Sequence, residues 1–216
     1  MNTAEKGDKT RWQTSTAFLA ITTKEMKSNR HGQSRVLDTN QLDLLISNLS
    51  DQHHQLVAEV CRRTGCRVGE ATQLTWGMVS ESAITFQRGI TKGKLASRSV
   101  PVTPVLWEAL RAWRAAWVVR QGRDPVAGDY LVPGRFAGSC LSTRSFMDAL
   151  EKAAAQSGLE GVSSHSFRRS ALTSAHSAGV PLRVLMALSG HKSMSALQRY
   201  LEVTPAQRVA AAAAFA

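Results

Sequence analysis

The sequence predicts a mainly α-helical domain with one small β-hairpin, which places it in the α+β class. Two observations lead to this prediction. From Asp38 onward, apolar residues recur at helical spacing through most of the chain, and glycines fall where those patterns stop. Between residues 83 and 102 the pattern changes to short β-branched runs on either side of a polar turn. We expect a basic arm over residues 1–34, a main domain over 35–204 and a tail helix over 205–216.

The first helices are predicted from cap signals and from apolar periodicity. Asp38 and Gln41 have capping-box spacing ahead of a leucine-rich run, so a helix should begin there. A second helix over about residues 52–63 would turn its apolar side chains inward. Gly65 should end that helix, and a third, short helix is expected over 69–76.

The hairpin is predicted from two short apolar runs. Residues 83–86 and 98–102 are rich in β-branched side chains, and Gly93 lies in the turn region between them. Lys92 and Lys94 flank that glycine, so the tip of the hairpin should be basic.

Helical spacing returns after the hairpin. A helix over about 104–120 places a leucine and tryptophan stripe on one face, and Gly122 should end it. Further helices are expected over 142–156, 165–178, 181–189 and 194–201.

The charge balance points to a polyanionic partner. The chain carries 27 Lys and Arg against 16 Asp and Glu, a formal net charge of +11. Nucleic acid is the simplest such partner, although a basic surface can also serve solubility alone. No apolar run is long enough to span a membrane, and the first residues lack the apolar stretch of a signal peptide. We therefore expect a cytoplasmic protein without a membrane partner.

Three cysteines, Cys61, Cys66 and Cys140, raise the question of metal binding. An odd number in a chain without a signal peptide is typical of reduced thiols. His53 and His54 lie near Cys61 and Cys66 in the sequence, but the spacing matches no common zinc motif. Buried structural cysteines are the better interpretation, and we expect neither a metal nor another cofactor.

Two basic motifs could bind and cleave a phosphodiester. Arg67 follows a glycine-ended helix and precedes a new helix, where free backbone N–H groups favour an anion. A guanidinium group there can bind two phosphate oxygens. An exposed lysine at the hairpin tip, Lys92 or Lys94, could donate a proton to a leaving oxygen. Taken singly, each motif is more often a surface residue or an ion-pair partner.

A second group of residues lies in the last third of the chain. His165 and Arg168 are three residues apart, so they share one face at the start of a predicted helix. His191 follows the helix-ending Gly190, and Tyr200 comes nine residues later on the next short helix. A tyrosine on a helix is usually a core residue, so only this company makes Tyr200 a candidate nucleophile.

In this order the motifs resemble the catalytic domain of the tyrosine site-specific recombinases and phage-type integrases. Thr-Gly-x-Arg-x-x-Glu at 64–70 resembles the first arginine box of that family, and Lys92 resembles its hairpin lysine. His-x-x-Arg, Gly-His and the following tyrosine resemble its second box. Phe167 replaces a usual leucine and Gly69 a usual small polar residue. Residues 1–34 are too few for the family's helical core-binding domain, so the resemblance is to a short form.

The resemblance implies an enzyme that joins DNA to Tyr200 through a 3′-phosphotyrosyl bond, without metal or nucleotide. Glu70 would position its neighbours. The resemblance also implies double-stranded DNA as partner, four protomers on two duplexes, a monomer or dimer when free, and accessory DNA-binding proteins in some systems. The implied catalytic residues are Arg67, Lys92, His165, Arg168, His191 and Tyr200. Beside them we assign DNA contacts to Lys94, Arg98, Arg169, Arg30 and Arg35.

Three other functions are compatible with parts of the sequence. Residues 181–201 could be a helix-turn-helix of a non-catalytic DNA-binding regulator, which would leave Arg67, His165 and Arg168 without a role. A type IB topoisomerase-like enzyme would use the same chemistry without exchanging partners. An RNA-binding module is less favoured, because no aromatic stacking motif is present.

Overall fold

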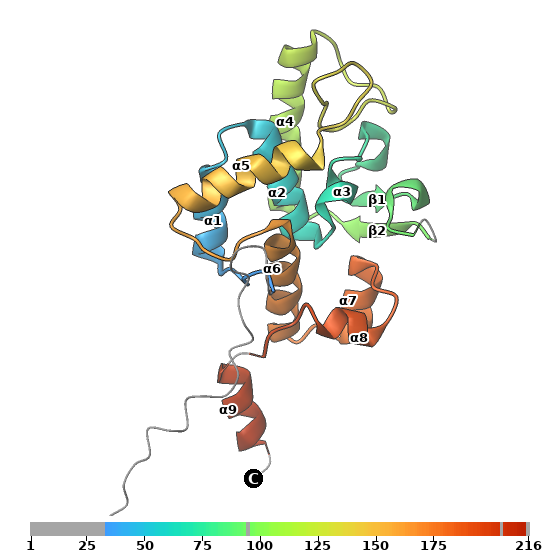
Figure 1. Ribbon diagram of the computed structural model, residues 1–216. Coiled ribbons are helices and arrows are strands. Elements are labelled where there is room, and N and C mark those ends of the chain that lie inside the picture. The colour runs from blue at the N-terminus through green and yellow to red at the C-terminus, as the bar shows by residue number, and fades with distance from the viewer. Residues whose placement is uncertain (1–32, 94–95, 204, 215–216) are drawn as a thin grey trace, which may run out of the picture.

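The computed structural model describes residues 33–93, 96–203 and 205–214, which form a mainly helical fold with a small sheet, as predicted (Figure 1). In chain order the described elements are α1 (Thr39–Ser47), α2 (Gln52–Thr64), α3 (Val68–Ala71), η2 (Trp76–Met78), β1 (Ala83–Phe86), η3 (Arg88–Ile90), β2 (Arg98–Pro101), α4 (Pro104–Gln121), α5 (Thr143–Gln156), α6 (Ser164–Ser177), α7 (Leu182–Ser189), α8 (Met194–Gln198) and α9 (Pro205–Ala213).

Helix α2 is the central element of the fold. It packs against α1, α3, α4 and α6, so most of its surface is covered by other helices (Figure 1). Leu56, Val57 and Val60 are buried on it, as the apolar pattern predicts. The expected face of α4 is buried against α2 and includes Trp113 and Trp117. This packing fixes the C-terminal end of α2, from which the candidate site begins.

The predicted caps are confirmed. Asp38 accepts a hydrogen bond from the Gln41 backbone N–H, and the Gln41 side chain accepts one from the backbone of Asp38. Gly65 ends α2 at a φ of 62°, and Gly190 ends α7 at a φ of 68°. A side chain at either position would be strained in this left-handed conformation. The two glycines therefore let the backbone turn sharply out of each helix just before Arg67 and His191.

The hairpin forms, but its tip is longer than expected. Strands β1 and β2 pair antiparallel, with Phe86 opposite Arg98. Our prediction that Lys92 directly follows the first strand is wrong, because residues 87–91, which include η3, lie between β1 and Lys92. The Ser97 hydroxyl accepts a hydrogen bond from the Arg88 backbone N–H, which draws the chain into a turn instead of extending the ladder. Gly93 has a φ of 81°, as a tight turn requires.

The short helix expected over 69–76 is divided in the structure. Helix α3 ends at Ala71, and the separate turn η2 begins at Trp76. The N–H groups of Trp76 and Gly77 donate to the carbonyl oxygens of Asp129 and Ala127. Because the loop at residues 127–131 takes these donors, they cannot continue the helix.

The last short helix also differs from the prediction. It was expected over 194–201, but α8 ends at Gln198, so Tyr200 lies in the turn that follows. The Thr173 hydroxyl of α6 donates to the carbonyl oxygen of Tyr200 and accepts from the N–H of Glu202. These bonds to α6 replace the bonds that another helical turn would make.

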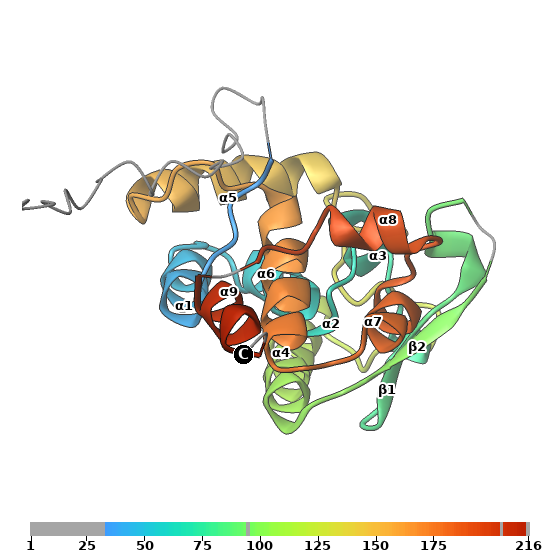
Figure 2. The ribbon, with the colours of Figure 1, turned by 90° about the horizontal axis from the view of Figure 1, so that it is seen from below.

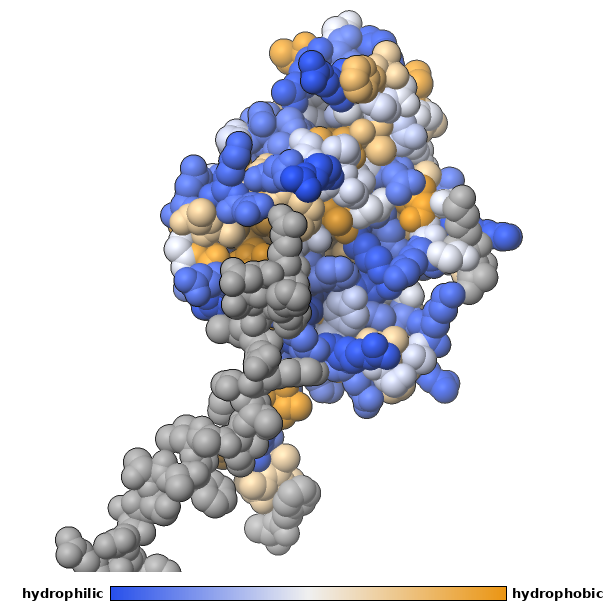
Figure 3. Space-filling model, in the orientation of Figure 1, coloured by the Kyte–Doolittle hydropathy of each residue, from blue (hydrophilic) through white to orange (hydrophobic). Residues whose placement is uncertain are grey.

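The chain ends away from the core. Helix α9 forms as predicted and stands apart from the other helices in Figure 1. The expected basic arm falls almost entirely on residues 1–32, which lie outside the described residues. Among the described helices, none is both long and apolar enough to cross a membrane. The face over α6, α7 and α8 is mainly hydrophilic in Figure 3.

Candidate active site

Arg67 lies where α2 turns into α3. Its backbone N–H donates to Glu70 Oε2 at 2.9 Å, and its Nη1 lies 3.3 Å from Glu70 Oε1. Glu70 itself is 2% exposed and accepts a second charged hydrogen bond, 2.6 Å long, from Arg98 Nη2. One buried carboxylate therefore holds two guanidinium groups, from the α2–α3 junction and from β2, in fixed positions.

The charge of Glu70 is maintained despite its burial. Burial alone would raise the pKa of this carboxyl group, but the hydrogen bonds from Arg98 and from the Arg67 backbone, with the charges of both arginines, lower it below its ordinary value. Glu70 is therefore ionised at neutral pH. The side chain of Arg67 is 24% exposed and remains open to a ligand.

Arg168 lies on α6 and is almost wholly buried, at 1% exposed. Its Nη1 donates to the Gly65 carbonyl oxygen at 2.6 Å, and its Nη2 donates to the Ser189 carbonyl oxygen at 2.8 Å. Desolvation and the charge of Arg67 lower the pKa of Arg168 to about 10, so the group keeps its charge at neutral pH. Arg168 therefore ties the ends of α2 and α7 together and concentrates positive charge between them.

His191 lies on the turn after α7 and contacts the same arginine. Its Nε2 is 3.1 Å from Arg168 Nη2, and its Nδ1 is 2.7 Å from the Ser189 hydroxyl oxygen. Because that hydroxyl donates to the Leu185 carbonyl oxygen, the Nδ1–H of His191 donates to Ser189. Burial and the charges of Arg168, Arg67 and Arg98 lower the pKa of His191 to about 3, so its ring is neutral at pH 7.

Tyr200 faces this group of residues from the turn after α8. The Tyr200 ring centroid is 4.9 Å from that of His191, and Arg168 Cζ lies 5.4 Å from the Tyr200 ring. The Tyr200 hydroxyl is 3.4 Å from His165 Nδ1. The structure thus brings together four of the predicted catalytic residues: His165, Arg168, His191 and Tyr200.

The other two predicted catalytic residues, Arg67 and Lys92, share a cavity with two members of this group, His165 and Arg168. The cavity has a volume of about 410 Å³, and its walls come from the α2–α3 junction, the hairpin tip and the first turns of α6. Arg67, Lys92, His165 and Arg168 all line it. In Figures 1 and 2 strand β2 of the hairpin lies beside α7, and the two elements are in contact. A phosphate-sized anion in this cavity would meet cations from three segments that lie far apart in the sequence.

The predicted DNA-contacting arginines do not behave alike. Arg98 is held by Glu70, donates to the Leu188 carbonyl oxygen and stacks over Phe86 with its Cζ 4.4 Å from the ring centroid. Arg169 is 5% exposed and bonds to the Ser34 carbonyl oxygen and to Glu202. The geometry gives both side chains contacts inside the protein. Arg35 is partly exposed near the start of the described chain, and Lys94 and Arg30 lie outside the described residues.

The sequence did not single out several residues that shape the site. Ser189 fixes the His191 ring, and Thr173 and Glu202 hold the chain directly after Tyr200. Ser189 contacts a ring two positions away, whereas Thr173 and Glu202 are joined to residues about 30 positions away in the sequence. For Thr173 the signal in the sequence was the recurrence of polar residues on the inward face of α6.

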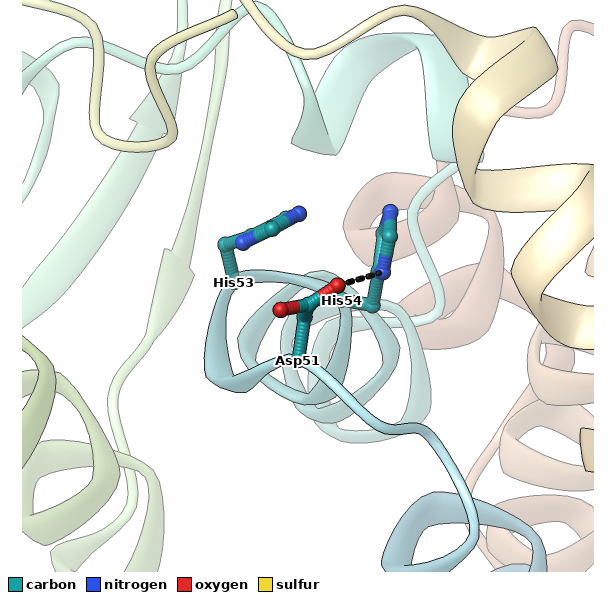
Figure 4. Close-up of side chains that lie close together, drawn as sticks. All are labelled: Asp51, His53 and His54. Atoms are coloured by element: carbon teal, nitrogen blue, oxygen red, sulfur yellow. Dashed lines mark ion pairs between the residues drawn. The ribbon is translucent and has the colours of Figure 1, made fainter.

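A possible cation site lies elsewhere, at the N-terminal end of α2. Asp51, His53 and His54 have ligand-type atoms within 4.8 Å of one another, and His54 Nδ1 is 3.7 Å from Asp51 (Figure 4). Arg120 Nη1 lies 3.1 Å from His53 Nδ1 and would oppose a cation there. Cys61 and Cys66, which prompted the zinc question, lie at the other end of the helix and are buried with their sulfur atoms 3.9 Å apart.

The low pKa of His191 gives a testable pH dependence. Between about pH 6.5 and pH 3 the unfolded chain binds a proton at this residue that the folded protein does not. The free energy of unfolding should therefore fall as pH falls through this window. In His191→Gln that part of the slope should disappear.

The measurement is urea unfolding of both proteins between about pH 4 and pH 7. His53, whose pKa is lowered to about 4, acts in the same direction in both proteins and cancels in the difference. Equal slopes in the two proteins would refute the assignment.

A family model and individual relatives both compare this chain with integrases and tyrosine recombinases. The model of the phage integrase family matches residues 35–207. The tyrosine recombinase XerD of Mycobacterium leprae is 33% identical over 159 residues, which cover 70% of this chain and 48% of that protein. XerC of Bifidobacterium longum is 28% identical over 163 residues, covering 71% of this chain and 44% of that protein. The chain thus spans about half the length of the curated relatives it matches.

The solved structures agree on the fold. The crystal structure of XerA recombinase superposes with a TM-score of 0.66 at 23% identity, over 83% of this chain and 62% of that one. A post-cleavage complex of the XerH site-specific recombinase with its difH substrate gives a TM-score of 0.68 at 21% identity, over 86% of this chain and 54% of that one.

Proposed function

The chain belongs to the phage integrase family, and on this basis we propose that it is a site-specific DNA recombinase with Tyr200 as its nucleophile. The observation that carries the proposal is the placement of Tyr200. Its hydroxyl lies 3.4 Å from His165, and its ring contacts both His191 and the buried cation Arg168. A tyrosine with a purely structural role is usually surrounded by apolar side chains, whereas Tyr200 has two histidines and an arginine beside its ring and hydroxyl.

The reaction is a transesterification at a DNA phosphate. The Tyr200 oxygen attacks phosphorus, a phosphotyrosyl P–O bond forms, and the P–O bond to the 5′ oxygen breaks. The tyrosine proton passes to His165, and the leaving 5′ oxygen takes a proton from Lys92. A 5′-hydroxyl of another strand then reverses the step. The number of phosphoester bonds is unchanged, so the reaction balances without nucleotide or metal.

Three residues would stabilise the charge that develops on the non-bridging phosphate oxygens. Arg67 and Arg168 supply fixed positive charge at the cavity, held by Glu70 and by two carbonyl oxygens respectively. His191 would bind a phosphate oxygen only with its proton on Nε2, so we propose that phosphate binding opens the Arg168–His191 contact and moves the ring proton from Nδ1 to Nε2, with the Ser189 hydroxyl then donating to Nδ1. The two arginines, as fixed donors, are effective because they need little reorganisation in the transition state.

The proposed partner is double-stranded DNA. The net charge of +11 suits a polyanion, and the related XerH recombinase was solved with its difH substrate. We propose four protomers on two duplexes during exchange, a monomer or dimer without DNA, accessory DNA-binding proteins in some reactions, and a cytoplasmic location. Integration, excision, inversion and resolution all use this chemistry.

The proposal reassigns two of the expected DNA contacts. Arg98 and Arg169 are positioning residues, since both guanidinium groups are bound inside the protein. Arg35, Lys94 and Arg30 remain proposed DNA contacts. Lys92 is the proposed general acid because it lines the cavity, with Lys94 as the alternative.

The test is a suicide-substrate assay with Tyr200→Phe as the matched variant. The substrate is a duplex from the chain's genetic neighbourhood, nicked beside each candidate cleavage point. It traps the covalent intermediate because the short fragment that carries the freed 5′-hydroxyl diffuses away. Wild type should give a covalent protein–DNA band on a denaturing gel, and Tyr200→Phe should give none.

The rival functions predict other results. A non-catalytic regulator would bind DNA equally tightly in both forms and give no covalent band. A type IB topoisomerase-like enzyme would give the band and relax supercoiled plasmid of any sequence. A recombinase should instead act only on DNA that contains its specific target sequence, and it should exchange strands between two labelled duplexes that both carry that sequence.

A further inference from the structure

Helix α6 carries a second row of polar residues beside the candidate active site. Arg169 and Thr173 are four residues apart, so they lie on one face of the helix. Both are 5% exposed. His165 lies four residues before Arg169 on the same face and meets the Tyr200 hydroxyl. One helix face thus runs from the hydroxyl of Tyr200 to the backbone around it.

Thr173 holds the backbone on both sides of Leu201, directly after Tyr200. Its hydroxyl donates to the Tyr200 carbonyl oxygen at 3.2 Å and accepts from the Glu202 N–H at 3.3 Å. A single hydroxyl group therefore satisfies one acceptor and one donor of a segment that is neither helix nor strand.

Arg169 holds the side chain at the end of the same segment. Its Nη2 donates to Glu202 Oε1 at 2.7 Å, and its Nη1 donates to the carbonyl oxygen of Ser34. The carboxylate of Glu202 is about half exposed, whereas the guanidinium group is buried. The pair therefore ties a surface segment to an interior cation, which is stronger than a pair between two exposed groups.

We infer that Thr173 and Arg169 are positioning residues that hold Tyr200 in its attacking position by fixing the 200–202 segment to α6. The inference rests on the proposed function and deepens it. Without these contacts the segment keeps its turn hydrogen bonds to the Leu197 and Gln198 carbonyl oxygens, the 3.4 Å contact of its hydroxyl with His165, and apolar packing against a small leucine cluster, but no bond that joins its backbone to α6. Apolar packing restrains the position of the ring but not the direction of the hydroxyl group.

The matched variants are Thr173→Val and Thr173→Ser. Valine keeps the shape of threonine and removes the hydroxyl, whereas serine keeps the hydroxyl. Displacing a reacting group by about 1 Å can cost about 100-fold in rate. Thr173→Val should therefore lower the single-turnover rate of covalent complex formation on the nicked duplex by about 10- to 100-fold. Thr173→Ser should stay within about threefold of wild type, and both should bind DNA as wild type does.

A second substrate separates positioning from general damage to the site. A DNA strand that ends in a 3′-(4-nitrophenyl) phosphate can be joined to a 5′-hydroxyl strand without Tyr200. The new P–O bond forms to the 5′ oxygen, and 4-nitrophenolate leaves. This joining uses the phosphate-binding groups but not the nucleophile. Thr173→Val should join it at the wild-type rate, and so should Tyr200→Phe.

Glu202→Ala tests the same contact from its exposed side, where folding is least affected. It should lose covalent complex formation but keep the joining activity. Glu202→Gln can still accept a hydrogen bond from Arg169 and should form the covalent complex. Glu151→Ala, which removes an exposed carboxylate from α5, should change neither activity.

Each outcome has one meaning. Loss of covalent complex formation with joining intact supports positioning. Equal loss of both activities in Thr173→Val, or wild-type rates in both, would overturn the inference while leaving the proposed function in place. If the wild type itself forms no covalent complex and joins no activated strand, the proposed function fails instead.

Discussion

Replacing Arg168 with Lys is expected to lower the rate of DNA cleavage by about 100- to 1000-fold while DNA binding persists. Lysine keeps the positive charge but cannot donate to two carbonyl oxygens and a ligand in one plane. The Gly65 and Ser189 carbonyl oxygens would then lack a partner, and the ends of α2 and α7 would no longer be joined. The single-turnover rate on a nicked duplex measures the effect.

The control for this prediction is an arginine of the surface. Arg144 pairs with Asp148 along α5 and its side chain is 78% exposed. Arg144→Lys should change neither the cleavage rate nor the melting temperature. Full cleavage activity in Arg168→Lys would show that a point charge suffices and that the two carbonyl contacts have no catalytic consequence.

The largest expected change in stability is that of Glu70→Ala. Removing this carboxylate leaves the buried Arg98 without its charged partner. Breaking a buried pair in this way costs about 3–5 kcal/mol of the free energy of unfolding. Urea unfolding at neutral pH measures the loss.

A double variant shows whether the cost comes from the unpaired charge. In Glu70→Leu with Arg98→Met both charges are absent, so the free energy of unfolding should recover most of the loss. Recovery is expected without activity, because Arg67 loses its support from Glu70 as well. If Glu70→Ala is as stable as wild type, water or another group must satisfy Arg98 and the pair has little structural role.

Much of the local structure could be predicted because it depends on short-range chemistry. Gly65, Gly122 and Gly190 end helices in the left-handed conformation, and the Asp38 cap depends on a residue three positions away. Arg67 and His191 each follow such a glycine by one or two residues. Their positions at the ends of α2 and α7 were therefore visible in the sequence.

The remainder depended on contacts between distant residues. Arg168 and Arg169 are adjacent and identical in type, yet one lines the cavity and the other binds Ser34 and Glu202. Nothing in the local pattern separates them. Tyr200 leaves its helix because Thr173, 27 residues away, takes its backbone carbonyl. The sequence analysis assigns Arg98 to DNA, because its partner Glu70 lies 28 positions away and the pairing cannot be seen from the residues around Arg98.

The central claim is that Tyr200 becomes covalently joined to DNA. Its most direct test is to trap the intermediate on a nicked duplex, digest the protein and the DNA, and identify the modified peptide by mass spectrometry. The account predicts one peptide, containing Tyr200, with a residual nucleotide linked through a 3′-phosphate to the tyrosine oxygen. Attachment at Tyr130 or at another residue, or a trapped complex that persists in Tyr200→Phe, would contradict it.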